Sequence, residues 1–178
     1  MKKFIADPSF WSLFPQAAIG VLTVRDVDEA AKLTGEQAAE VAALLKSANA
    51  AAMGYLEKTL PLSQNRVVAV WREAYQRFPA KKGARCSIEA LLKRVSKGEP
   101  VGAIAPTVDI TNAVSLKYAL PIGVEIMAAF QGDLHLGVMA GGEYFLPIGS
   151  AEQDPPRPGE LAYYDDAGVV CRCWNWRD

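Results

Sequence analysis

The chain has 178 residues, of which 51 % are hydrophobic and 22 % are charged. This length fits one domain, and so apolar a composition excludes a disordered chain. No stretch supplies the roughly 20 consecutive apolar residues of a membrane span. The N-terminus reaches Asp7 and Pro8 too early for the apolar region of a signal peptide. We therefore expect a globular, cytoplasmic protein that does not enter a membrane.

The first third of the chain predicts one strand and one helix. Residues 18–24 are β-branched and apolar, which is typical of a buried strand. Residues 35–58 place Ala, Val and Leu at helical spacing and predict a helix that is broken near Asn49 or Gly54.

Three further helices are expected in the middle of the chain. Ser63 is placed to cap the first of them, and Ser87 begins the second, which Gly98 ends. Residues 108–118 predict the third, although their Val, Ile and Thr are also typical of a strand. The core face of the first of these helices is expected to consist of Val67, Val70, Trp71, Ala74, Tyr75 and Phe78.

After Pro121 the pattern changes to that of strands. Residues 134–139 alternate along a strand, residues 144–148 predict another short strand, and residues 159–174 predict a β-hairpin with a Gly-bearing turn. With helices over residues 28–118 and strands over residues 120–178, the sequence predicts a single α+β domain over residues 1–178.

The sequence contains none of the common catalytic signatures. It has no Gly-rich phosphate loop, no nucleophile elbow and no zinc-protease helix. The one histidine, His135, shares its strand face with Asp133 and Gly137. This face is expected to be the solvent side, which favours a surface histidine over a general base.

Cysteine usage excludes a disulfide framework and argues against a metal site. The chain has three cysteines, an odd number and too few for its length. A structural zinc site takes four ligands in two spaced pairs, and one histidine with three cysteines does not form that pattern. No metal and no cofactor are expected.

Positive charge is concentrated in one part of the chain. Between Arg66 and Lys97 there are nine basic residues and two acidic ones, Glu73 and Glu89, although the whole chain has a formal net charge of −1. Such asymmetry is typical of a nucleic-acid footprint. The alternative is a solvated helical face, since charge runs usually only keep a surface soluble.

One motif carries a family resemblance. Residues 108–112, Val-Asp-Ile-Thr-Asn, and the following helix to Pro121 resemble the B3/B4 domain of the phenylalanyl-tRNA synthetase beta subunit, where V-D-V-T-N leads to a Q-P-M-H-A-F-D segment. Residues 71–75, 86–95 and 174–177 look like the free-standing B3/B4 proteins. The resemblance covers residues 66–178 and implies mixed or antiparallel strands in a β-sandwich-like arrangement flanked by helices.

The resemblance also implies a function. In the synthetase, this domain hydrolyses tyrosine mistakenly attached to the phenylalanine tRNA, because a pocket for Phe discriminates weakly against one extra hydroxyl. A free-standing relative is expected to bind tRNA or aminoacyl-tRNA and to deacylate mischarged tRNA in trans. The alternative is a non-catalytic module that binds tRNA or an amino acid. The expected contacts to the tRNA backbone are Arg72, Lys81, Lys82, Arg85, Lys93 and Arg94.

The sequence departs from the family at the editing site. The family's histidine falls at Gly123, its arginine falls near Gly102, and its Gly-Gly pair falls around residues 174–176. The acidic residue that recognises the tyrosine hydroxyl lies beyond Asp178, so the chain is expected to be C-terminally short.

Seven residues remain as candidates for the site. Asn112, Ser115 and Glu125 are expected to be catalytic, by positioning a water or holding an amino group. The structural alternative is that Asp109 caps the helix and that Asn112 is a buried hydrogen-bonding residue. The residues expected to bind substrate are Asp109, Gly123, Trp174 and Asn175.

Overall fold

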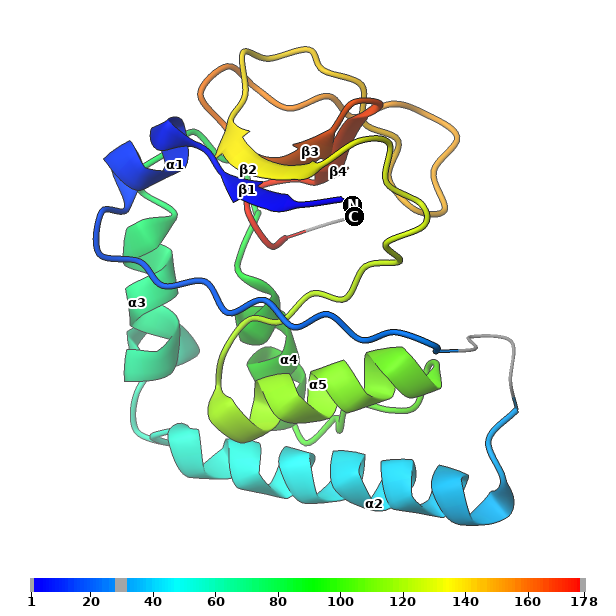
Figure 1. The fold of residues 1–178 in the computed structure, drawn as a ribbon. Helices are drawn as coiled ribbons and strands as arrows, with labels where there is room; N and C mark the ends of the chain where they lie inside the picture. The colour runs from blue at the N-terminus through cyan, green and yellow to red at the C-terminus, as the bar shows by residue number, and fades with distance from the viewer. Residues whose placement is uncertain (1, 28–31, 177–178) are drawn as a thin grey trace.

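A computed structural model describes residues 2–27 and 32–176 (Figure 1). The start of the predicted helix-rich region, residues 28–31, and Arg177 of the closing motif lie outside the described residues. In chain order the elements are β1 (Phe4–Ala6), α1 (Pro8–Leu13), α2 (Gly35–Ala52), the short 3₁₀ helices η1 (Met53–Tyr55) and η2 (Leu62–Gln64), α3 (Arg66–Ala74), α4 (Ser87–Ser96), α5 (Pro106–Tyr118), β2 (Leu134–Val138), β3 (Leu161–Asp165) and β4 (Gly168–Cys171).

The four strands form one mixed sheet in the order β1-β2-β3-β4. β1 runs parallel to β2, and the long connection that parallel strands need is supplied here by the helices between them. β3 is antiparallel to β2 and forms the predicted hairpin with β4. The fold is therefore a single α+β domain, as predicted.

Local signals account for the helix boundaries. Thr34 and Gln37 form a capping box at the start of α2, each side chain bonding to the backbone of the other. The helix gives way to η1 at Met53, next to Gly54, where a break was predicted. Pro106 opens α5, which is helical throughout, so the ambiguity of this segment is settled in favour of a helix.

Two hydrophobic cores meet at α3. One lies among α2, α3, α4 and α5, and the other lies between the sheet, α1 and residues 173–176. Trp71 of α3 and Tyr75, the residue directly after this helix, pack against both. Figure 1 shows the arrangement, with the sheet and α1 on one side of the molecule and α2 and α5 on the other. Residues 173–176 are thus connected to the helical core through the packing of Trp71 and Tyr75.

The prediction of a buried strand over residues 18–24 is wrong. This segment is an extended, exposed connection, with Val21 62 % and Leu22 87 % exposed. A buried strand needs neighbours for its backbone groups. The position beside β2 is taken by β1 on one side and by β3 on the other.

Two smaller predictions also need correction. Residues 144–148 form a loop and not a strand, and Pro147 within them has no N–H to donate to a ladder. α3 begins after Asn65 and not at Ser63, and its buried valine is Val68, whereas Val70 is 57 % exposed. No helix in the described part of the chain is long and apolar enough to cross a membrane.

Candidate functional site

Two of the predicted polar site residues on α5 bond to the backbone at its ends. Asp109 is 5 % exposed, and its Oδ1 accepts from the N–H of Ile104 at 2.7 Å. Ser115 is 1 % exposed and donates to the carbonyl of Leu120 at 2.5 Å. These contacts order the turn before α5 and the left-handed turn after it, at Ala119. Both side chains are thus buried, and each is engaged with the backbone.

Asn112 and Gly123 are the more open of the predicted positions. Asn112 lies half-buried on α5, one turn after Asp109, and the described contacts include no hydrogen bond from its side chain. Gly123 lies in the exposed connection between α5 and β2, and a Cβ built on it meets nothing within 4 Å. There is thus open space at Gly123, whereas Asn112 is partly covered.

Trp174 interacts with a residue that the sequence analysis missed, Tyr163 of β3, which also lies within the electrostatic influence of Glu125. Burial raises the pKa of the Tyr163 hydroxyl to about 12, the Cys171 and Glu125 charges add to the rise, and a hydrogen bond with the Trp174 side chain opposes it. Tyr163 therefore remains a protonated phenol at neutral pH. The alternation of the hairpin, which places Tyr163 on the face of Leu161, was the available signal.

Trp174 belongs to the aromatic core. It is 8 % exposed, and its ring centroid lies 4.8 Å from Phe14, 5.3 Å from Trp71 and 5.7 Å from Phe10. Edge-to-face and tilted pairs at these distances are favourable packing arrangements. The indole ring faces other aromatic rings and leaves little area for a ligand.

Asn175 caps α4. Its Oδ1 lies 3.2 Å from the N–H of Ser87, the first residue of the helix, and 3.1 Å from the hydroxyl of Tyr75. The Tyr75 hydroxyl also lies 2.7 Å from the carbonyl oxygen of Cys173. This contact ties the C-terminal residues to both α3 and α4.

Half of the predicted RNA-binding residues form ion pairs with carboxylate side chains of this protein. Arg72 donates to Glu89 at 2.6 and 3.1 Å, Arg85 lies 3.8 Å from the same carboxylate, and Glu89 is 1 % exposed. Lys81 donates to Asp154 at 2.5 Å. The remaining three predicted contacts are exposed and have no carboxylate partner among the described residues: Lys82, Lys93 and Arg94.

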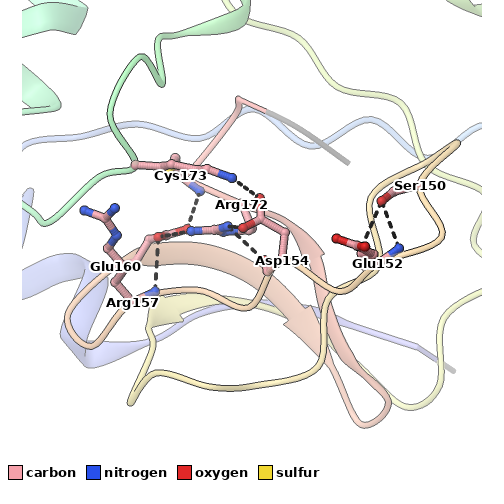
Figure 2. A network of polar contacts seen from close by, with 8 residues as sticks. Ser150, Glu152, Asp154, Arg157, Glu160, Arg172 and Cys173 are labelled. Atoms are coloured by element: carbon pink, nitrogen blue, oxygen red, sulfur yellow. Dashed lines mark hydrogen bonds and ion pairs between the residues drawn. The ribbon is translucent and has the colours of Figure 1, made fainter.

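A buried ion pair anchors the loop that carries Asp154 (Figure 2). Arg172 is 1 % exposed and Glu160 is fully buried, and two hydrogen bonds of 2.8 and 2.7 Å join them. Arg172 also lies 2.8 Å from the Asp154 carboxylate, which Lys81 binds from the other side. A hollow of about 250 Å³ lies beside Lys81 and Asp154. Its lining residues are Lys81, Pro147, Ser150, Glu152, Gln153 and Asp154.

The charges of this network shift the pKa values of its members. Burial alone would raise the pKa of both carboxyl groups. In Glu160, the Arg172 hydrogen bond and charge outweigh burial, and in Asp154 the contacts with Lys81 and Arg172 do so, so that both pKa values lie below their ordinary range. Both carboxylates are therefore ionised at neutral pH.

The cysteines do not supply a reactive centre. Cys86, Cys171 and Cys173 are free thiols and all three are buried. Burial raises the pKa of Cys86 and of Cys173 to about 12, so these two thiols are not thiolates at neutral pH. Among residues 2–27 and 32–176, no group of His, Cys, Asp and Glu side chains is arranged to hold a metal ion.

Comparison with known proteins identifies one family. The family model of the B3/4 domain matches residues 70–178, which include the second half of α3, all of α4 and α5, and the strands β2, β3 and β4. No curated protein and no solved structure matches the chain.

Proposed function

Because the chain belongs to the B3/4 domain family, we propose that it is a free-standing tRNA-binding domain of the cytoplasm. The observation that carries the proposal is the excess of positive charge on α3, α4 and the loop between them. Nine basic residues lie between Arg66 and Lys97, and their carboxylate partners in this structure are Glu73, Glu89 and Asp154. Most of the positive charge therefore remains to meet phosphates.

Two groups can be distinguished among these basic residues, according to whether they form ion pairs within the protein. Arg72, Lys81 and Arg85 hold the loop and α4 in place through buried or half-buried carboxylates. Lys93 and Arg94 are exposed in the last turn of α4, where a cation also suits the helix dipole. We expect this second group to bind RNA directly and the first to shape the surface.

Gel-shift titration with phenylalanine tRNA tests this assignment. The Lys93→Ala/Arg94→Ala variant removes two exposed cations from α4 and is expected to weaken binding by about tenfold, since phosphate contacts dominate such affinities. Lys46→Ala/Lys58→Ala is the matched control, because both lysines are exposed and lie outside the basic stretch. Equal affinities of the two variants would refute the assignment of the tRNA surface to α4.

Hydrolysis of mischarged tRNA is a second candidate function, favoured by the half-buried Asn112 side chain and by the open space at Gly123. In this reading, Asn112 and Glu125 hold the aminoacyl ester and its water, and Ser115 and Asp109 fix α5. The binding role stands first because the Ser115 hydroxyl and Oδ1 of Asp109 already bond to the backbone.

Release of labelled amino acid distinguishes the two candidates. The substrates are tyrosine-charged and phenylalanine-charged phenylalanine tRNA. Selective release of tyrosine that is lost in Asn112→Ala would establish the deacylase. Retention of both charged tRNAs without release would leave the binding function alone.

A further inference from the structure

The chain's one histidine lies in a polar cluster on the face of the sheet that is turned away from the aromatic core. His135 is paired with Tyr164 across β2 and β3, whereas its neighbour Leu136 packs into the core with Leu161. The prediction that His135 faces solvent is therefore only partly right. Its side chain is 27 % exposed and lies against Asp7 and Tyr164.

Two contacts fix the imidazole, and a third fixes its partner Asp7. Its Nδ1 lies 3.0 Å from Oδ1 of Asp7, and the Tyr164 hydroxyl donates to Oδ2 of the same carboxylate at 2.6 Å. The ring also stacks on Tyr164, with centroids 5.0 Å apart and an interplanar angle of 28°. Gly137 makes room for this arrangement, because a Cβ there would lie 2.2 Å from Oδ2 of Asp7.

The hydrogen bond to Asp7 sets the tautomer of His135. An ionised carboxylate only accepts hydrogen bonds, so Nδ1 carries the proton and the lone pair of the neutral ring lies on Nε2. The described contacts include no hydrogen bond to Nε2. Burial and the Asp7 contact raise the pKa of Tyr164 to about 12, so its hydroxyl remains a donor to Asp7. A carboxylate that orients an imidazole in this way is the arrangement of a general base.

The cluster is not required merely to fasten the N-terminal segment. The N–H of Asp7 donates to the carbonyl of Leu136 at 2.9 Å, and the N–H of Val138 donates to the Ser9 hydroxyl at 3.1 Å. These two contacts already hold β1 and α1 against β2. The imidazole, with its side chain 27 % exposed, is therefore available for a role beyond fastening the segment.

We propose that His135 is the proton acceptor of a second reaction site, on this face of the sheet, where it promotes hydrolysis of carboxylic esters. A water gives one proton to Nε2 as its oxygen forms a bond to the ester carbonyl carbon. The bond from that carbon to the alcohol oxygen then breaks, and the alcohol takes the proton from Nε2. The products are a carboxylic acid and an alcohol, and no oxidant, reductant or cofactor is consumed.

The position of His135 restricts the substrate class. The hollow beside Lys81 is formed by a different loop, and His135 lies on a strand face with its side chain 27 % exposed. An ester at an accessible end of a larger molecule can reach it, whereas a small ligand gains little enclosure there. The proposal does not rest on tRNA binding by α4, since the two surfaces are built from different elements.

Hydrolysis of p-nitrophenyl acetate tests the proposal without knowledge of the natural ester. His135→Gln keeps an amide donor for Asp7 and is expected to reduce the protein-dependent rate to that of buffer. Asp7→Asn is expected to lower it by about a hundredfold, at the small end of general-base effects. Asp133→Asn is the matched control, because Asp133 bonds to the N–H of Lys3 and not to His135. It is expected to keep the full rate.

Two results would overturn the proposal. One is a rate in His135→Gln equal to that of the unmodified protein, with both folded by circular dichroism. The other comes from the ¹⁵N resonances of the single imidazole in the unmodified protein: these are expected to report a proton on Nδ1, and a proton on Nε2 would contradict the proposed geometry. Loss of tRNA binding would leave both readouts unchanged.

Discussion

Arg172→Met is expected to destabilise the protein by about 3–5 kcal/mol, the cost of removing one partner of a buried ion pair. The structure leaves Glu160 fully buried, with only the backbone N–H groups of Arg157 and Cys173, both at 3.2 Å, to replace the guanidinium. Asp154 keeps Lys81 as a partner. Most of the loss therefore comes from the uncompensated charge of Glu160.

Urea unfolding followed by tryptophan fluorescence measures this loss. Arg94→Met is the matched control, because Arg94 is exposed and makes no ion pair among the described residues. It is expected to change the free energy of unfolding by less than about 0.5 kcal/mol. The double variant Arg172→Met/Glu160→Met is expected to cost much less than the sum of its single changes, since it removes both charges together. A loss below about 1 kcal/mol in Arg172→Met would refute the reasoning.

The pH dependence gives an independent test of the same pair. The folded-state pKa values of Glu160 and Asp154 lie below those of the unfolded chain. Their stabilising contribution is therefore complete above the ordinary carboxyl range and is lost as the pH falls through the folded-state values, below about pH 4. Arg172→Met is expected to reduce this acid-dependent loss of stability.

Other positions give further expected outcomes. Gly137→Ala forces a Cβ toward the carboxylate of Asp7 and is expected to cost about 1–3 kcal/mol by thermal unfolding; an unchanged midpoint would contradict the close approach. Asn65→Ala removes buried hydrogen bonds to Glu57 and Pro61 and is expected to cost about 1–3 kcal/mol in urea, whereas a neutral result would mean that the loop holds without them. Cys86 is expected to resist a thiol reagent at neutral pH until the protein unfolds, because its thiol is buried and its pKa is about 12; immediate labelling of the folded protein would disagree.

Local signals allowed most of the helices and the hairpin to be predicted. The break of α2 near Gly54 and the turn between β3 and β4 depend on residues that are adjacent in the sequence. The failure over residues 18–24 has a different origin, because the segment is apolar enough for a strand but the sheet has no free position beside β2. Strand formation depends on partners that one segment does not specify.

The candidate site was less predictable for a related reason. The sequence places Asp109 and Ser115 on one helix, but whether their oxygens are free depends on the backbone of Ile104 and Leu120. Likewise, nothing in the spacing of the basic residues shows that Arg72 forms an ion pair with the buried Glu89. These facts come from loop geometry, which periodicity does not encode.

The salt dependence of tRNA affinity tests the central claim most directly. Each cation that meets a phosphate releases counterions, so the slope of log Kd against log salt concentration counts the contacts, at roughly 0.9 per phosphate for a duplex. We predict that Lys93→Ala/Arg94→Ala lowers this slope by about 2, whereas Lys46→Ala/Lys58→Ala leaves it unchanged. Equal slopes in all three proteins, or affinity that is independent of salt, would contradict a tRNA surface on α4.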